Sequence, residues 1–204
     1  MNKYLLYVLV VMFCSVTDAF AILPVEVKAI DLGLPSGTKW ANMNIGATKP
    51  EEFGGCFAWG ETKKKDKNTW ENYIHCDGSD NTCHDIGNDI SGTKYDVAHV
   101  KWGSGWKMPT IEQFIELFIC CEGKWTKVNG VYGYKFTSNI NGKSIFFPAA
   151  FEGPFNSLFG AYWLSNQLEE DSRRACIFFF EEYDADSKSS SRCMGLSVRP
   201  VINE

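Results

Sequence analysis

The stretch Trp102-Gly-Ser-Gly-Trp-Lys-Met-Pro-Thr110, with the Ile-Glu-Gln-Phe-Ile-Glu-Leu-Phe-Ile-Cys run that follows it, predicts the main helix of the chain. Thr110 and Gln113 have the spacing of a capping box, in which each side chain bonds the backbone N–H of the other residue. Behind this cap, apolar residues recur at helical spacing and predict one stripe that a sheet must bury. The stripe consists of Ile111, Phe114, Ile115, Phe118 and Ile119, and we expect Trp102 and Trp106 to be buried with it.

Short strands are predicted on both sides of this helix. Two runs around the turn Pro35-Ser-Gly37 predict a first hairpin, and residues 50–53 have the composition of a short helix start. After the main helix, Asn-Gly pairs separate alternating apolar runs, which is the strongest short-range signal for a hairpin. The expected strands are residues 25–32, 39–43, 125–128, 131–137, 143–148, 162–165, 175–183 and 196–201.

Residues 61–95 are polar, glycine-rich and without apolar periodicity, so we expect a long loop there. Loops of this length are usually functional or held by cross-links. One amphipathic helix in a strand-rich chain predicts an α+β fold. We expect a twisted antiparallel sheet, one or two helices and a long irregular loop region.

The N-terminal segment has the composition of a secretory signal peptide. Lys3 precedes an apolar run over residues 4–16, and Ala19-Phe-Ala21 supplies the small residues of a cleavage site. We therefore assign residues 1–21 to a signal peptide and residues 22–204 to one domain of 183 residues (204 − 21).

Export is the expected localisation, either to the extracellular space or to the cell surface. Lipoprotein anchoring through Cys14 is disfavoured, because Met12 and Phe13 are bulky where such signals normally have small residues. The apolar run is too short for a membrane span. The formal net charge of -5, without a basic cluster, argues against a nucleic-acid partner.

The cysteines predict a disulfide. Without Cys14, seven remain, and in an exported protein an odd number leaves at least one thiol unpaired within the chain. We predict that Cys76 and Cys83 are bonded and close a small loop. The adjacent His75 and His84 suggest zinc as an alternative, but neighbouring residues of an extended chain point to opposite sides. The sequence leaves open the pairing of Cys56, Cys120, Cys121, Cys176 and Cys193.

Acidic residues in the long loop offer oxygen ligands for calcium. Asp77, Asp80, Asp85 and Asp89 lie there, but their spacing does not match the EF-hand pattern. A solvated acidic loop is the better interpretation, and we predict no cofactor and no metal site.

Several segments, in this order, resemble the Fibrobacter succinogenes major paralogous domain family, which is abundant in exported proteins of gut bacteria. The resemblance covers nearly all of the expected mature chain. The matching segments are Asp31-Leu-Gly-Leu-Pro-Ser-Gly-Thr-Lys-Trp-Ala41, Phe57-Ala-Trp-Gly-Glu61, Trp102-Gly-Ser-Gly-Trp-Lys-Met-Pro-Thr110, Ile145-Phe-Phe-Pro-Ala-Ala150, Tyr162-Trp-Leu-Ser165 and Gly195-Leu-Ser-Val-Arg-Pro-Val201.

The resemblance implies a C-type lectin-like fold, in which the chain ends pair as strands and a long loop region carries the ligand site. It implies a non-catalytic binding or adhesion module for a glycan or protein partner. The Glu-Pro-Asn, Gln-Pro-Asp and Trp-Asn-Asp runs of calcium-dependent sugar binders are missing, so we expect binding without calcium. Some proteins of this fold present a hypervariable C-terminal segment as the ligand face.

Two alternatives to a binding module remain at this point, a structural surface component and a catalytic relative of the formylglycine-generating enzymes. The catalytic relative needs paired reactive cysteines. Cys120 and Cys121 lie at the end of an apolar helix, and a thiol buried among apolar groups is a poor nucleophile. Only three histidines are present, so groups for acid–base catalysis are few. We predict that the chain is not an enzyme.

The segment after residue 162 carries the predicted ligand face. In Ala175-Cys-Ile-Phe-Phe-Phe-Glu181, strand alternation separates even-numbered from odd-numbered residues. Both sets are largely apolar, so either the strand is buried on both sides or the odd-numbered face binds a ligand. The flanking segments are polar, as in exposed loops, and the long loop is expected to lie beside them. We place ligand contacts on Trp163, Asn166, Arg173, Ile177, Phe179, Glu181, Tyr183 and Arg192.

Overall fold

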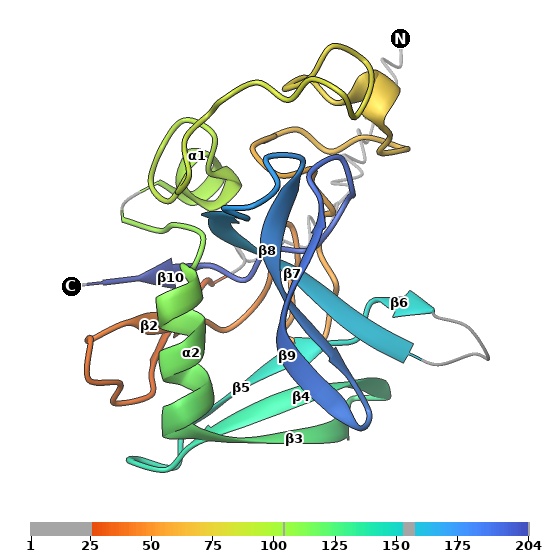
Figure 1. The fold of residues 1–204 in the computed structure, drawn as a ribbon. Helices are drawn as coiled ribbons and strands as arrows, with labels where there is room; N and C mark the ends of the chain where they lie inside the picture. The colour runs from red at the N-terminus through yellow and green to blue at the C-terminus, as the bar shows by residue number, and fades with distance from the viewer. Residues whose placement is uncertain (1–25, 104, 153–157, 204) are drawn as a thin grey trace, which may run out of the picture.

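The protein is built mainly from antiparallel strands, with few helices and long connecting loops (Figure 1). The structure, a computed structural model, describes residues 26–103, 105–152 and 158–203. The predicted signal peptide lies outside these residues. At the level of an α+β fold with a long irregular loop, the sequence-based prediction is confirmed.

Ten strands form three antiparallel sheets within the described residues. The terminal sheet has the order β1-β2-β10 and consists of β1 (Ala29–Asp31), β2 (Lys39–Ala41) and β10 (Val201–Ile202). The hairpin sheet consists of β3 (Cys121–Val128), β4 (Val131–Ser138) and β5 (Ser144–Pro148). The central sheet consists of β6 (Phe151–Glu152), β7 (Leu158–Gln167), β8 (Arg174–Glu181) and β9 (Asp184–Ser191).

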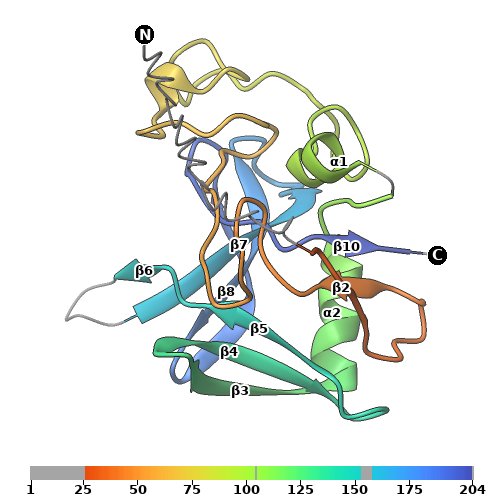
Figure 2. The same cartoon turned by 180° about the vertical axis from the view of Figure 1, so that it is seen from behind.

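Both ends of the described chain meet on strand β2. Trp40 lies opposite Ile30 of β1 and opposite Val201 of β10, and both pairings are antiparallel. Figure 2 shows β2 and β10 side by side next to the C-terminus. The expectation that N- and C-terminal strands share a sheet is confirmed, although the two strands flank β2 and do not pair with each other.

The hairpin sheet follows the turn signals of the sequence. Asn129 and Gly130 have φ of 49° and 88°, so both central residues of the β3–β4 turn are left-handed. This is the backbone of a type I′ turn, for which Asn-Gly is the preferred pair. Val128 lies directly opposite Val131 across the turn.

Helix α2 (Ile111–Cys120) begins as predicted but buries a different face. Thr110 and Gln113 form the full capping box. The buried residues are Phe114 and Leu117, whereas Ile115, Phe118 and Ile119 are 46%, 43% and 74% exposed. The predicted stripe is therefore wrong in phase: apolar residues surround most of this short helix, so their spacing fits two faces.

Two further expectations about this region are wrong. Trp102 and Trp106 are only half-buried, and they pack edge to face against each other with ring centroids 5.4 Å apart. Residues 50–53 form a turn instead of a helix. A short helix that the sequence did not predict, α1 (Val97–Trp102), begins at Asp96, whose buried carboxylate accepts from the N–H groups of Ala98 and His99.

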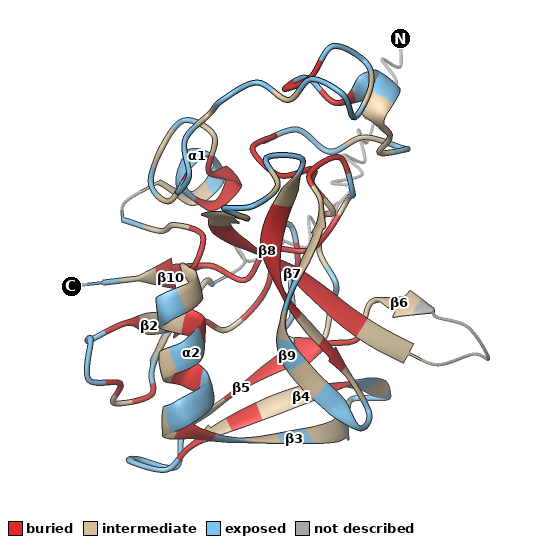
Figure 3. Cartoon of the chain, viewed as in Figure 1, coloured by how far each residue is buried: buried red, intermediate tan, exposed pale blue. Residues whose placement is uncertain are grey.

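Strands β7 and β8 form a wall between two apolar cores. Burial is concentrated along these strands (Figure 3). Even-numbered residues face the helix-side core, whose members include Phe114, Leu117, Phe136, Phe147, Tyr162, Leu164, Cys176, Phe178 and Phe180. Odd-numbered residues face the loop-side core, whose members include Ile45, Phe57, Trp59, Val97, Ala161, Trp163, Ala175 and Ile177. The alternative of a strand buried on both sides is the one that the structure bears out.

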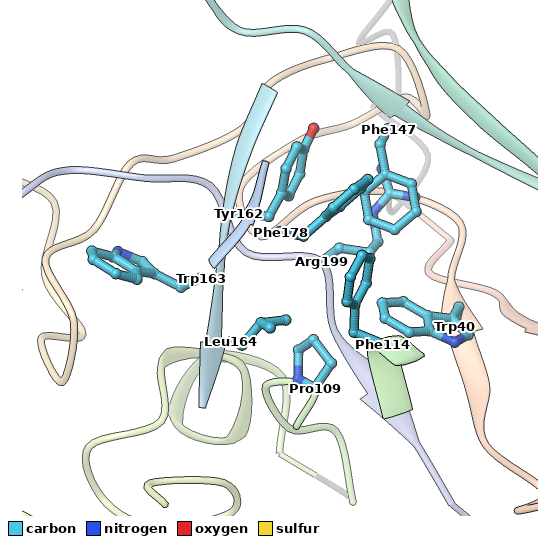
Figure 4. A pocket seen from close by; sticks show the side chains of 9 residues that line it. All are labelled: Trp40, Pro109, Phe114, Phe147, Tyr162, Trp163, Leu164, Phe178 and Arg199. Atoms are coloured by element: carbon cyan, nitrogen blue, oxygen red, sulfur yellow. The ribbon is translucent and has the colours of Figure 1, made fainter. Parts of the chain in front are cut away.

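Arg199 is enclosed by the aromatic rings of the helix-side core. Its guanidinium donates to the Asn44 side-chain oxygen (2.7 Å) and to the carbonyls of Ala41 (3.2 Å) and Phe146 (2.8 Å). Figure 4 shows Arg199 beside Phe147, with Trp163 on the opposite side of β7. Burial lowers the pKa of Arg199 to about 10, so it stays charged at neutral pH. The void beside it measures about 10 Å³, which is no larger than one water.

Strand β9 was expected to be an exposed polar loop, and this expectation is wrong. It pairs with β8 along its full length, from Arg174 opposite Ser191 to Glu181 opposite Asp184. Serine, aspartate and lysine on an edge strand keep the free edge from pairing with other chains. Because β9 is polar throughout, its sequence lacks the apolar alternation by which strands are recognised.

Candidate ligand-binding site

The long loop is fastened to the central sheet by Arg192. This residue is fully buried, and its guanidinium reaches both the loop and the segment before β8. It donates to the Tyr73 hydroxyl (2.8 Å), the Gln167 side-chain oxygen (3.2 Å), and the carbonyls of Ser172 (2.9 Å) and His84 (3.2 Å). The guanidinium also lies over the Trp59 ring, 4.7 Å from its centroid. The expectation that the long loop lies beside the segment after residue 162 is confirmed.

Glu61 holds the beginning of the same loop from inside. Its side chain is buried, and its carboxylate accepts hydrogen bonds from the Lys65 ammonium at 2.6 Å and from the Ile74 N–H at 2.9 Å. Together with Arg192, this contact fixes the loop at two points. The loop residues between these points are therefore presented from a rigid base.

Three of the eight predicted ligand contacts are buried, which corrects their assignment. Trp163 donates its indole N–H to the Phe57 carbonyl at 2.7 Å, inside the loop-side core. Ile177 lies directly opposite Trp163 on the neighbouring strand and packs into the same core. Arg192 fastens the loop, as described above. All three were predicted from polar flanks and alternation, which do not show that a second core covers this face.

Asn166 also has a structural role. Its side-chain oxygen accepts from the N–H of Ile111 at 2.8 Å, so it satisfies a donor in the first turn of α2. Phe179 is half-buried, with its ring 5.5 Å from that of Phe159 and the Lys188 ammonium 4.0 Å above its centroid.

The remaining predicted contacts lie at opposite ends of β8. Arg173 precedes the strand on the loop side, whereas Glu181 and Tyr183 lie at the β8–β9 turn. Seven residue steps along a strand span roughly 23 Å. Tyr183 is 92% exposed, but it cannot share one small ligand with Arg173. The residues that were predicted to form one ligand face therefore lie at two separate places on the protein.

A polar pocket of about 150 Å³ lies where the long loop meets the start of β8. It is the place that joins the two regions from which ligand contacts were expected. Of the predicted contacts, only Arg173 lines it. The lining residues are Trp70, Asp80, Asp171, Arg173, Arg174 and Ser191.

Three of the four charged groups that line the pocket are held by hydrogen bonds. Arg173 forms a two-pronged pair with Asp171, at 2.8 Å from Nε and 2.9 Å from Nη2. This pair raises the pKa of Arg173 and lowers that of Asp171. Arg174 donates to the side chain (3.0 Å) and the carbonyl (2.6 Å) of Ser189 on β9. Two cations and two carboxylates line the pocket, so its formal charge is balanced.

Trp70 supplies the apolar surface of the pocket. It opens the 3₁₀ helix η1 (Trp70–Asn72), which begins at Thr69 with a capping box, and its ring is half-buried against Tyr73. The centroids of these two rings are 5.7 Å apart, edge to face. One side of the indole is therefore packed, and the ring still contributes to the pocket lining.

Cys76 and Cys83 lie directly opposite each other, although both are free thiols in this structure. Hydrogen bonds flank the pair, from His84 N–H to the His75 carbonyl and from Asp77 N–H to the Thr82 carbonyl. Such a non-hydrogen-bonded position brings Cα atoms to about 4.5 Å, which lies within the range of disulfides. The disulfide stays a prediction, and the backbone suits it.

The thiols and imidazoles have properties that suit structure better than catalysis. Burial raises the pKa values of Cys121 and Cys193 to about 11 and that of Cys176 above its ordinary value. Thiols with such pKa values carry little thiolate at neutral pH. Burial lowers the pKa of His75, whose ring nitrogen bonds the Gly60 carbonyl at 3.0 Å. His84 pairs with Asp77 at the exposed surface.

The described part of the chain shows neither a metal-binding cluster nor a membrane-spanning helix. In that part, no group of three or more His, Cys, Asp or Glu side chains is arranged to hold a metal ion. Asp77 and Asp80, which the sequence offered as oxygen ligands, point to other partners: Asp77 bonds His84 at 2.9 Å, and Asp80 lines the pocket beside Arg173. No described helix is both long and apolar enough to span a bilayer.

Comparison with known proteins does not add to this geometry. No protein-family model, no curated protein and no solved structure matches the chain. The resemblance to the Fibrobacter succinogenes major paralogous domain family therefore stays a prediction from the six sequence segments. The function must be argued from the site itself.

Proposed function

We propose that this chain is an exported, non-catalytic binding module that recognises a neutral saccharide in the pocket formed by Trp70, Asp80 and Arg173. The observation that carries the proposal is the combination of one indole ring with charged groups that balance one another. A sugar ring has an apolar face and a rim of hydroxyl groups. It needs a flat apolar surface and fixed donors and acceptors beside it.

The charge balance of the pocket favours such a ligand over an ionic one. Asp171 already accepts two of the five N–H groups of Arg173, and Arg174 is bound to Ser189. A charged ligand would have to compete with these contacts, whereas a hydroxyl can donate to a carboxylate and accept from a guanidinium at the same time. A volume of about 150 Å³ suits one small ring, since pockets for drug-sized ligands start near 300 Å³.

The topology supports a C-type lectin-like fold as part of the same proposal. Strands from both chain ends flank β2, and the long loop carries one wall of the pocket, as the sequence resemblance implies. Binding would then be independent of calcium, because Arg173 and Trp70 take the place of a metal in ordering the site. The rival class, a catalytic relative of the formylglycine-generating enzymes, is disfavoured because burial raises the pKa of Cys121, one of the paired thiols that it would need.

The test is a glycan array probed with the purified protein in the presence and absence of EDTA, followed by variants. Trp70→Ala should weaken binding by roughly thirtyfold, as expected when an aromatic anchor of about 2 kcal/mol is removed. Arg173→Ala should weaken it similarly without affecting the fold, because Arg173 is exposed. Tyr183→Ala is the matched control, since Tyr183 is exposed at the other end of β8.

Binding that survives EDTA and falls only in the Trp70 and Arg173 variants supports the proposal. Binding that is lost with EDTA, or that falls equally in the Tyr183 variant, contradicts it. Turnover of a thiol-containing peptide by the wild-type protein would favour the catalytic rival.

A further inference from the structure

A second pocket, of about 210 Å³, lies between helix α1 and the loop that follows β2 and leads to Phe57. Its walls come from three parts of the chain that are distant in sequence. Backbone of the loop after β2 forms one side, Lys64 at the start of the long loop forms another, and Lys101 on α1 the third. None of these residues takes part in the saccharide pocket, so the inference does not depend on the proposed function.

The charge of this pocket is unbalanced. Lys64 and Lys101 both line it, and no carboxylate does. Neither lysine forms an ion pair within the described residues. The Lys101 ammonium lies 5.5 Å from the centroid of the Phe57 ring, which keeps it at the pocket wall. Two lysines without a carboxylate partner line the same pocket, and their positive charge favours an anion there.

The rest of the lining consists of three glycines, Gly46, Gly54 and Gly55, together with Ile45 and Phe57. Gly46 and Gly54 have φ of 78° and 73°, a conformation that residues with a side chain rarely adopt. A Cβ at Gly54 would also overlap the Ile45 carbonyl oxygen, and one at Gly55 would meet the Phe57 ring at 2.7 Å. Within the described residues, the N–H groups of Gly46 and Gly54 have no acceptor. Both glycines line the pocket, so their unbonded N–H groups are candidate donors to an anion there.

We infer that this pocket binds an oxyanion group, a sulfate or a phosphate, through Lys64, Lys101 and the glycine backbone. The ammonium groups supply charge, and the backbone N–H groups supply direction, as in other oxyanion sites. The oxyanion is either free or carried by a sugar. The volume of the pocket leaves room for a single small ring in addition to the oxyanion.

The inference is tested by calorimetric titration of the purified protein with inorganic sulfate, inorganic phosphate, N-acetylglucosamine 6-sulfate and N-acetylglucosamine. At least one of the three anions should bind, more weakly as salt is raised, and N-acetylglucosamine should not bind at this site. Tighter binding of the sulfated sugar that persists in the Trp70→Ala variant identifies a sugar-borne group, whereas equal binding of inorganic sulfate identifies the free anion.

The variants use a neighbouring lysine as control. Lys64→Gln and Lys101→Gln should each weaken anion binding by about tenfold, as expected for the loss of one charge-assisted contact. Lys63→Gln removes the same charge one residue away, outside the pocket, and should change affinity less than about twofold. Lys64→Arg keeps the charge and should retain most of the binding, which separates charge loss from misfolding.

The inference is overturned if no anion binds the wild-type protein, or if Lys63→Gln weakens binding as much as Lys64→Gln. Trp70→Ala should leave anion binding unchanged. Failure of the saccharide proposal and failure of this inference are therefore distinguishable in the same set of variants.

Discussion

At the scale of single residues, two arginines adjacent in space to the same loop have opposite roles. Arg192 is buried and donates to four partners on the long loop and the sheet, whereas Arg173 is exposed and paired with one aspartate. Residue type alone does not distinguish the buried role of one arginine from the exposed role of the other. Arg192 is held by carbonyls, a hydroxyl and an aromatic ring, so it has no carboxylate partner whose sequence spacing would have revealed it.

This contrast gives a matched pair of variants. Arg192→Met should lower the free energy of unfolding by more than about 3 kcal/mol, because Tyr73, Gln167 and two carbonyls lose a charged donor inside the protein. Arg173→Met should change it by less than about 0.5 kcal/mol, as is usual for an exposed position. Urea unfolding measures both. Equal effects of the two substitutions would show that Arg192 does not anchor the loop.

At the scale of elements, the sequence predicts most strands, whereas three of the eight predicted ligand contacts lie inside the protein. Alternation located β8 and its two faces, and the Asn-Gly pair located the β3–β4 hairpin, because these signals depend on near neighbours only. The buried face of α2 and the second core against Ile177 depend on what packs against them, which no local pattern contains.

The site shows the same limit. Trp70 and Asp80 lie in an aperiodic loop, where spacing does not tell which side chains converge. Arg174 is placed by pairing with β9, an edge strand whose polar sequence hid it. Arg173 was found because it is a charged residue in a polar flank, and the flank proved to border the pocket.

The backbone β-bridge that pairs Cys76 with Cys83 yields a prediction about the tip of the long loop. Under oxidising conditions the two thiols should form a disulfide, which for so short a loop stabilises by about 2–3 kcal/mol. Cys83→Ser should lower the melting temperature of the oxidised protein and leave that of the reduced protein nearly unchanged. Peptide mapping under non-reducing conditions identifies the bond.

The nearest competitor for that bond is Cys193, which packs in the same small cluster as Cys76 and Cys83. A mapped peptide joining Cys193 to either of them, or a Cys76 that alkylates in the oxidised protein, would show the predicted pairing to be wrong.

At the scale of the whole molecule, the two cores share one wall and should therefore unfold together. Ile177 and Phe178 are neighbours on β8 but belong to different cores. Ile177→Ala should cost about 2–5 kcal/mol and Phe178→Ala about 3–5 kcal/mol, and each should shift one and the same transition. Differential scanning calorimetry and near-ultraviolet circular dichroism measure it. Two separate transitions in either variant would mean that the cores are independent units.

On β7 and β8, odd-numbered and even-numbered residues face different cores, and this has a consequence for how the sequence of the protein can change in evolution. Along β7 and β8, odd-numbered positions contribute only to the side that supports the pocket-bearing loop, and even-numbered positions only to the side beneath α2. Mutations at odd positions can thus remodel the support of the long loop over evolutionary time while the other core keeps its packing. Homologues should accordingly show two substitution rates that alternate, residue by residue, along the same two strands.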